Sequence, residues 1–186
     1  SVTYANGQHN DHVLEQDLQT SQLLVNSAGV SSTQRQWLYS IVNDAVTAAN
    51  ANDLYASIML AQATLETGWG GSMLALFNNN LFGIKENGSP YASGSVTYKT
   101  GEYIDGTISN VDGTFNTYES IEDCFLDYVR MLMNNTYYAN VFRSKASNYI
   151  EAAHNIQNDG YATDPDYATK IINIIQRNNL NFLDGD

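Results

Sequence analysis

The sequence predicts a mostly helical α+β fold. Apolar residues recur at helical spacing over most of residues 32–178, and the period changes to alternation only within residues 96–118. The chain of 186 residues is 43% hydrophobic, which is enough for one well-buried core. We therefore expect a single domain over residues 32–186, preceded by a Ser-, Gln-, Asn- and Thr-rich linker or packed arm over residues 1–31.

Two helices are predicted in the first half of the domain. The first begins near Ser32 and Thr33, whose hydroxyls can cap free backbone amides, and runs to about Asn50. The second begins after Asp53 and ends before Gly68, because glycine commonly terminates helices. The residues predicted to point inward are Trp37, Leu38, Ile41, Val42 and Ala45 in the first helix and Leu54, Ile58, Ala61 and Leu65 in the second, where Tyr55, Met59, Gln62 and Glu66 line a neighbouring face.

One β-hairpin is predicted, within residues 96–118. Asp105-Gly106 is a strong signal for a two-residue hairpin turn, and the segment before it has the alternation of a strand. The residues that share one face of that segment are Tyr98, Thr100, Glu102 and Ile104. A hairpin between helical segments makes the domain α+β rather than all-α.

Three helices are predicted after the hairpin. The first starts at Ser120, which forms a capping-box-like pair with Asp123. The second covers about residues 145–157. The third starts at Asp164-Pro165, a cap followed by proline at the first helical position, and runs to about Asn178. The residues predicted to be buried are Ile121, Phe125, Tyr128 and Leu132 in the first of these helices and Ile171, Ile174 and Ile175 in the third.

The composition excludes several classes of protein. The formal net charge of −12, from 20 acidic and 8 basic side chains, argues against a nucleic-acid partner, because phosphate contacts rely on clustered Lys and Arg. The chain has no run of about 18 apolar residues, so we expect no membrane insertion. The single cysteine, Cys124, lies in an apolar helical pattern and is predicted to be a buried thiol.

Glu66 is the candidate general acid. It lies in the last turn of the predicted second helix, directly before a turn that contains Gly68, Trp69 and Gly70. Partial burial beside an indole disfavours the charged form of a carboxyl group, and the negative end of a helix dipole does the same. A carboxyl group that keeps its proton is what glycosidic bond cleavage requires. The structural alternative is a solvated Glu at a helix end.

Three motifs resemble those of one enzyme family. Residues 66–70 form a Glu-Thr-Gly-Trp-Gly motif, residues 80–85 match Asn-Leu-Phe-Gly-x-Lys, and residues 160–167 match Gly-Tyr-Ala-Thr-Asp-Pro-x-Tyr. In this order they resemble the peptidoglycan N-acetylglucosaminidases of glycoside hydrolase family 73, which include bacterial autolysins and a flagellar wall-digesting enzyme. The resemblance covers about residues 53–180 and implies a lysozyme-like helical lobe, with a small β-hairpin lobe over a substrate cleft.

The resemblance also implies two catalytic carboxylates. It gives Glu66 the role of the acid and gives Glu102, in a Glu-Tyr dipeptide just before the hairpin turn, the role of the second acidic residue. The alternative for Glu102 is an exposed hairpin carboxylate without a catalytic role. Asp105 is explained by its turn, and Glu119 and Glu122 are explained by the first turn of a helix, where negative charge is stabilising.

Aromatic and loop residues are the candidate substrate contacts. The chain has 13 Tyr against 6 Phe and 2 Trp, and this excess of Tyr fits a wet sugar-binding groove, although it is equally common at ordinary interfaces. The substrate-binding candidates are Tyr161, Tyr167, Trp69, Asn80, Phe82, Gly83 and Lys85. Phe82 is as readily a core residue, Trp69 is as readily a packing element beside Glu66, and the Tyr161 segment also serves to end one helix and start the next.

No cofactor or metal ion is expected. His9, Asp11 and His12 are close in sequence, but they lie in the predicted arm, and a catalytic zinc site normally has three converging protein ligands. The third histidine, His154, lies on a late helix.

By this resemblance, the domain is expected to be a secreted enzyme of the bacterial cell wall. It would cleave the β-1,4 bond between N-acetylglucosamine and N-acetylmuramic acid in peptidoglycan. The chain begins at Ser1, without Met, so we expect a processed product or an excised domain that is attached to other wall-targeting domains in a longer protein. The alternatives are a muramidase or lytic transglycosylase of similar fold and a non-catalytic peptidoglycan-binding module. Retaining, inverting and substrate-assisted mechanisms are all compatible with the sequence.

Overall fold

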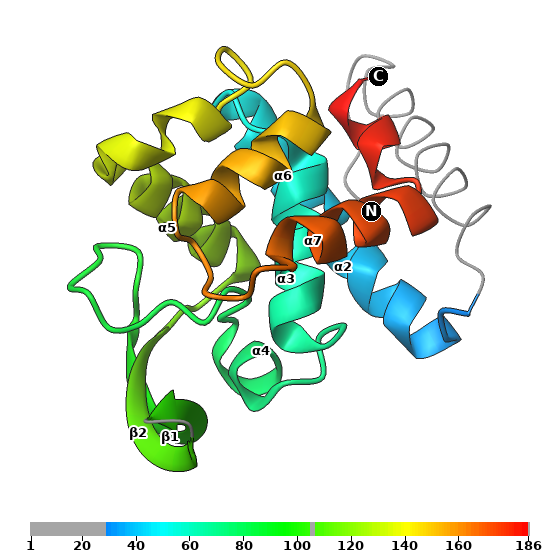
Figure 1. Ribbon diagram of the computed structural model, residues 1–186. Helices are drawn as coiled ribbons and strands as arrows, with labels where there is room; N and C mark the ends of the chain where they lie inside the picture. The colour runs from blue at the N-terminus through cyan, green and yellow to red at the C-terminus, as the bar shows by residue number, and fades with distance from the viewer. Residues whose placement is uncertain (1–28, 105–106, 186) are drawn as a thin grey trace.

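The computed structural model describes residues 29–104 and 107–185, and for residues 100–104 and 107–111 it describes the backbone. The predicted arm over residues 1–31 therefore lies almost entirely outside the described residues. In the described part, helices pack around one central helix, and a two-stranded hairpin extends from the helical body (Figure 1). The fold is α+β and mostly α, as predicted.

The described elements follow the predicted order, with three short helices added. They are α2 (Ser32–Ala51), α3 (Ala56–Thr67), α4 (Met73–Asn78), β1 (Gly94–Ile104), β2 (Thr107–Thr117), α5 (Ile121–Asn134), the 3-10 helix η1 (Thr136–Val141), α6 (Tyr149–Asn158), α7 (Tyr167–Arg177) and the 3-10 helix η2 (Leu180–Asp184). Helices α4, η1 and η2 were not predicted from the sequence, because each is too short to show a hydrophobic period.

Helix α2 begins at Ser32, as predicted, and its cap is Ser31 rather than Ser32 or Thr33. The hydroxyl of Ser31 accepts a hydrogen bond from the Gln34 backbone amide at 3.1 Å, and the Gln34 side chain accepts one from the Ser31 amide at 2.9 Å. These two bonds form a complete capping box. The buried residues of α2 are Leu38, Ile41, Val42, Ala45, Ala48 and Ala49. Trp37, predicted to point inward, is only partly buried.

Helix α3 is the centre of the domain. It packs against α2, α6, α7 and η2, and all residues from Ala56 to Thr64 are buried. The predicted single inward stripe is therefore too narrow, since α3 is covered from several sides and its small residues let the neighbouring helices approach closely. The helix ends at Gly68 as predicted, and the φ of Gly68 is 56°, in the left-handed region typical of a glycine C-cap.

The hairpin prediction is confirmed at the level of the backbone. Strands β1 and β2 are antiparallel, with Gly94 opposite Thr117 and Ile104 opposite Thr107. The predicted turn residues, 105–106, lie outside the described residues. The base of the hairpin is attached to α4, because the Tyr98 hydroxyl donates to the Asn78 side-chain oxygen at 2.8 Å.

Helix α5 starts where it was predicted to start. The hydroxyl of Ser120 accepts a hydrogen bond from the Asp123 backbone amide at 3.1 Å, which caps the helix. Phe125, Tyr128 and Leu132 are buried as predicted.

Helices α6 and α7 both begin later than predicted. Helix α6 begins at Tyr149 rather than near residue 145, because the Asn148 side chain caps it by accepting from the Glu151 amide at 2.8 Å. Helix α7 begins at Tyr167 rather than at Pro165. The Asp164 carboxylate accepts from the Asp166 amide at 2.9 Å. Asp164 therefore stabilises a turn that comes before the helix.

Cys124 is fully buried in the core, as predicted. Burial raises the pKa of its thiol to about 12, and its Sγ accepts a hydrogen bond from the Leu81 backbone amide at 3.4 Å. The environment of this cysteine is therefore that of a structural core residue.

None of the helices in the described part of the chain combines the length and the hydropathy of a membrane span.

Candidate active site

Glu66 lies in the last turn of α3, and the turn that follows it is fixed by Thr67. The Thr67 hydroxyl donates to the Ala63 carbonyl at 2.7 Å and accepts from the Gly70 amide at 2.8 Å. The chain between these bonds folds back against the helix end, and Trp69 there has a φ of 58°. Glu66 is thus held on a rigid helix with a braced terminus.

Gly70 allows α2 to pack directly on this turn. A Cβ atom at Gly70 would lie 2.2 Å from two atoms of the Trp37 indole, and the φ of Gly70 is 79°. Both facts require glycine at this position. Trp69, predicted as a substrate contact, is partly buried and packs against the core beside this junction.

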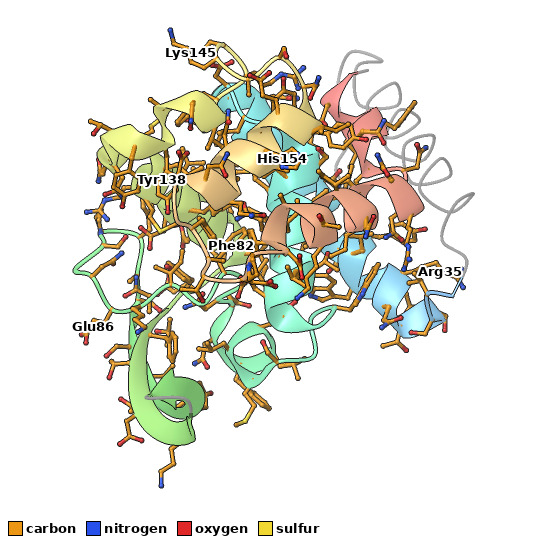
Figure 2. The ribbon with its side chains drawn as sticks, in the orientation of Figure 1. Arg35, Phe82, Glu86, Tyr138, Lys145 and His154 are labelled. Carbon is orange, nitrogen blue, oxygen red and sulfur yellow. The ribbon has the colours of Figure 1, made fainter. Side chains whose placement is uncertain are left out.

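A cavity of about 390 Å³ opens beside Glu66. Its lining residues are Glu66, Phe82, Gly83, Ile84, Lys85, Glu86, Asn87, Met131, Tyr138 and Tyr161. Phe82 and Glu86 come from the segment between α4 and β1, while Tyr138 comes from η1 (Figure 2). The cavity therefore brings together the end of the central helix and four other segments: residues 82–87, α5, η1 and the segment after α6.

Five of the predicted site residues line this one cavity: Glu66, Phe82, Gly83, Lys85 and Tyr161. Tyr167, Trp69 and Asn80 are not among the lining residues. The structure describes only the backbone of Glu102. The three motifs of the sequence thus meet in space, although not every motif residue reaches the surface of the cavity.

The environment of Glu66 favours its protonated form. Its side chain is exposed to the cavity, yet the surrounding protein displaces enough bulk water that desolvation raises its pKa. A hydrogen bond with Tyr167 acts in the opposite direction and lowers the pKa. The net effect is a raised pKa, as expected for a carboxyl group that donates a proton.

Tyr167 is a buried partner of Glu66 rather than a wall of the cavity. Its side chain is 2% exposed. Its ring stacks on that of Tyr161, with ring centroids 5.8 Å apart and an angle of 23° between the planes. Burial raises the pKa of both tyrosines. Both hydroxyls are therefore neutral hydrogen-bond donors near neutral pH.

Asn80 supports the floor of the cavity from beneath. It is 1% exposed, and its amide nitrogen donates to the carbonyls of Ile84 and Asn116, both at 2.9 Å. Its oxygen accepts from the Ile84 amide at 3.0 Å. Asn80, predicted to contact the substrate, therefore holds the lining loop in place through these hydrogen bonds and does not line the cavity itself.

Asp127 fixes the outer wall of the cavity. This fully buried carboxylate accepts from the Ser89 hydroxyl at 2.6 Å, the Tyr118 hydroxyl at 2.5 Å and the Asn116 amide at 3.2 Å. Arg130 lies 3.6 Å away. These contacts join α5, the end of β2 and the segment that carries Glu86 and Asn87, so this side of the cavity is tied to the helical body.

Glu102 lies in β1, opposite Ser109. Because only its backbone is described, the role of Glu102 as the second catalytic carboxylate stays a prediction. Among the described side chains, Glu86 is a second carboxylate that lines the cavity with Glu66. The sequence analysis did not single out Glu86.

The lining residues that the sequence analysis missed are Ile84, Glu86, Asn87, Met131 and Tyr138. Glu86 and Asn87 directly follow the motif that ends at Lys85, and this position in the sequence could have predicted them as lining residues. Met131 and Tyr138 belong to α5 and η1, and only the tertiary fold brings them to Glu66.

Within the described residues, no group of three His, Cys, Asp or Glu side chains is arranged to hold a metal ion. His154 is exposed on α6. His9, Asp11 and His12 lie outside the described part of the chain.

Comparison with known proteins gives a consistent set of relatives. The family model Glucosaminidase, described as mannosyl-glycoprotein endo-beta-N-acetylglucosaminidase, matches residues 42–180. A protein of Lactococcus lactis subsp. cremoris named "Probable N-acetylmuramidase" is 37% identical over 174 residues, which cover 90% of this chain and 38% of the relative. The exo-glucosaminidase LytG of Bacillus subtilis is 39% identical over 132 residues, which cover 69% of this chain and 45% of LytG.

A solved structure extends this similarity to three dimensions. The catalytic domain of the autolysin Auto from Listeria monocytogenes matches with a TM-score of 0.73 at 31% identity. The match covers 98% of this chain and 99% of that domain. By contrast, the chain spans only 38% of the length of the Lactococcus relatives.

Proposed function

Since the chain belongs to the glucosaminidase family, glycoside hydrolase family 73, we propose that it cleaves the glycan backbone of peptidoglycan. The bond cut is the β-1,4 bond between N-acetylglucosamine and N-acetylmuramic acid. Glu66 is the general acid, and it protonates the oxygen of the leaving sugar as the glycosidic bond breaks.

One observation carries this proposal. Glu66 ends a rigid helix, lines a cavity of about 390 Å³ and has a pKa raised by desolvation. Glycoside hydrolysis requires a carboxyl group that is still protonated when substrate binds and that lies within reach of the glycosidic oxygen. Glu66 combines accessibility from the cavity with a reduced tendency to ionise.

The lining of the cavity supports a carbohydrate ligand. Phe82 and Tyr161 supply aromatic groups beside Glu66, while Lys85, Glu86 and Asn87 supply polar groups. Aromatic rings suit the apolar faces of sugars, and polar side chains satisfy their hydroxyl and amide groups. Tyr161, Gly83 and Lys85 are proposed as direct contacts. Phe82 is 5% exposed and packs on Phe125 and Tyr128, so it is proposed as a contact only through the small part of its ring that lines the cavity. Tyr167, Trp69 and Asn80 act from behind the lining.

The second catalytic group is proposed to be Glu102. A separation of about 5–5.5 Å from Glu66 would suit a retaining mechanism, and about 6.5–9.5 Å would suit inversion by a water molecule. In a substrate-assisted route, the N-acetyl oxygen of the substrate is the nucleophile, and Tyr161 would position that amide group. Glu86 provides a further carboxylate in the same cavity.

The proposed location is the bacterial cell wall, outside the membrane. The matched relatives include proteins named as an autolysin and as a peptidoglycan hydrolase. Because these relatives are much longer than the matched region, we propose that further segments of the whole protein direct the domain to the wall.

The test is digestion of purified peptidoglycan, followed by borohydride reduction and mass spectrometry of the fragments. Wild type is expected to release fragments that end in reduced N-acetylglucosamine, and Glu66→Gln should lower turnover at least about a hundredfold. Glu119→Gln is the matched control, because Glu119 is exposed and lies outside the cavity. Equal activity of the Glu66→Gln and Glu119→Gln proteins would remove Glu66 from the mechanism.

The second candidate function is a muramidase, because the Lactococcus relatives carry the name "Probable N-acetylmuramidase". The same digestion separates the two activities. Reduced muramic acid ends would identify a muramidase, and anhydro ends would identify a lytic transglycosylase. The absence of fragments from several kinds of wall would favour a binding module.

A further inference from the structure

A chain of buried polar side chains leads from the core to Glu66. The Tyr128 hydroxyl donates to the Gln62 side-chain oxygen, and the Gln62 amide nitrogen donates to the Tyr167 hydroxyl at 3.1 Å. Tyr167 in turn interacts with Glu66, and hydrogen bonding between the two side chains lowers the pKa of Glu66 and raises that of Tyr167. The chain therefore runs across three helices, from α5 through α3 to α7, before it returns to α3.

Gln62 is an unusual residue for its position. It is fully buried in the central helix, between Ala61 and Ala63. A buried amide group is costly unless both its oxygen and its nitrogen are hydrogen-bonded. Both groups of Gln62 are satisfied, and both partners are tyrosine hydroxyls. Gln62 also lies four residues before Glu66, so the two side chains occupy the same face of α3.

The direction of donation follows from the number of protons available. Each tyrosine hydroxyl carries a single proton. The Tyr128 hydroxyl donates its proton to the Gln62 side-chain oxygen. The Tyr167 oxygen accepts from the Gln62 nitrogen, and within the described structure Glu66 is the acceptor that is left for the Tyr167 proton.

We propose that Gln62 is a positioning residue that keeps the Tyr167 hydroxyl as a donor to Glu66. The carboxyl oxygen of Glu66 that faces Tyr167 is then always an acceptor and cannot carry the acidic proton. The acidic proton is confined to the other carboxyl oxygen, which remains available to the substrate. This role rests on the proposed function of Glu66 as the general acid.

Loss of the Gln62 amide group reverses this arrangement. Without it, the Tyr167 hydroxyl is free to turn and to accept the proton of Glu66, so that the acidic proton points away from the substrate. The Tyr167 hydroxyl also becomes a weaker donor to the ionised Glu66 carboxylate. It no longer accepts a hydrogen bond from Gln62, and hydrogen bonds in a chain strengthen one another. Both effects favour a protonated Glu66 that transfers its proton poorly.

Other titratable groups also surround Glu66, and they influence its pKa in wild type and in the Gln62 variant alike. Those described are Tyr128 from α5, Tyr138 from η1, Tyr161 from the segment after α6, Tyr167 from α7, and Lys85 and Glu86 from the segment before β1. Substitution of Gln62 leaves all of these groups in place. A shift in the titration of Glu66 can then be assigned to the hydrogen-bond chain.

The first test compares Gln62→Met with wild type on peptidoglycan. Methionine keeps the volume and removes both hydrogen bonds. We expect kcat to fall about tenfold, a fraction of the full effect of a general acid, while KM changes little. The alkaline limb of the pH profile should move to higher pH. Damage that is merely structural would lower activity without moving that limb.

Tyr55→Phe is the matched control. Tyr55 directly precedes the same helix, and its backbone lies about 16 Å from that of Glu66 along the helix axis. Its buried hydroxyl donates to the Ala146 carbonyl at 2.7 Å. The variant removes a buried tyrosine hydroxyl as Tyr128→Phe does, and it should leave the pH profile unchanged. Tyr128→Phe should shift the profile in the same direction as Gln62→Met, although less.

A second measurement is independent of activity. Titration of the Glu66 carboxyl group by ¹³C NMR should give a higher pKa in Gln62→Met than in wild type, and Tyr55→Phe should match wild type. An unchanged Glu66 titration together with an unchanged pH profile would overturn the role of Gln62. Failure of wild type to cleave any wall would instead contradict the proposed function, and the NMR titration would still test the hydrogen-bond chain.

Discussion

At the scale of single residues, the position of Glu66 suits its proposed role as an acid and carries a cost in stability. Desolvation raises its pKa in the folded state, and its place in the last turn of α3 puts its negative charge near the negative end of the helix dipole. Both effects disfavour the ionised form in the folded protein. A residue that serves as an acid is expected to carry such a cost.

This cost predicts a dependence on pH. Because the folded-state pKa lies above that of the unfolded chain, the stability associated with protonated Glu66 is complete below the unfolded pKa and is lost as pH rises through the folded pKa. Glu66→Gln does not titrate, so its Tm relative to wild type should increase from about pH 4 to about pH 7. Calorimetry at several pH values would measure this difference. A constant difference across the range contradicts the raised pKa.

Two neighbouring glycines provide a second prediction. At Gly70 an added Cβ would meet the Trp37 indole at 2.2 Å, and the backbone is left-handed as well. Gly68 is also left-handed, but an added Cβ there meets no atom within 4 Å. We expect Gly70→Ala to destabilise the fold by about 2–4 kcal/mol and Gly68→Ala by about 1 kcal/mol. Urea unfolding would measure both, and equal losses would mean that packing against Trp37 is unimportant.

At the scale of elements, the wall of the cavity depends on one buried carboxylate. Asp127 accepts hydrogen bonds from Ser89, Tyr118 and Asn116, which lie in the two segments that meet α5. Asp127→Asn replaces one acceptor oxygen with a donor that faces other donors. We expect a loss of about 3 kcal/mol in the free energy of unfolding.

Glu122→Gln is the control for this substitution, because Glu122 is exposed in the first turn of the same helix. Removal of that charge should cost no more than about 1 kcal/mol. If Asp127→Asn were as mild as Glu122→Gln, the wall would have to be held by other contacts.

The sequence predicted the longer elements well and the helix starts less well. The Ser120 cap of α5 and the Gly68 end of α3 follow local rules that tertiary contacts did not alter. The predicted starts of α6 and α7 were wrong. Asn148 caps α6 at a later position than predicted, and Asp164 stabilises a turn that comes before α7 instead of capping the helix. Side-chain capping of this kind has several solutions in an Asn- and Asp-rich sequence.

At the scale of the whole molecule, the site could be predicted only where it follows local motifs. Glu66, Phe82, Gly83, Lys85 and Tyr161 lie in motifs and line one cavity. Met131 and Tyr138 complete that cavity from α5 and η1, and no local pattern marks them. Their contribution depends on how the helices pack around α3, which a single sequence does not encode in any short segment.

The identity of the second catalytic carboxylate also depends on the whole molecule, because the packing of the hairpin against the helices decides which carboxylate lies near Glu66. We predict that Glu102→Gln lowers kcat about tenfold to a hundredfold, since a general base or nucleophile would be lost. Glu86→Gln is the matched control on the cavity wall, and it should mainly raise KM. Steady-state kinetics on one purified wall would compare the two variants.

The opposite result would change the geometry of the mechanism. If Glu86→Gln lowered kcat and Glu102→Gln did not, the second carboxylate would belong to the segment that Asp127 ties to α5 through Ser89. That segment and the base of the hairpin are both joined to the helical body, through Asp127 and through the contact of Tyr98 with Asn78, whereas Glu102 lies near the far end of β1. A fixed pair of carboxylates would favour one separation and one stereochemical outcome, so the configuration of the first product would then identify the mechanism.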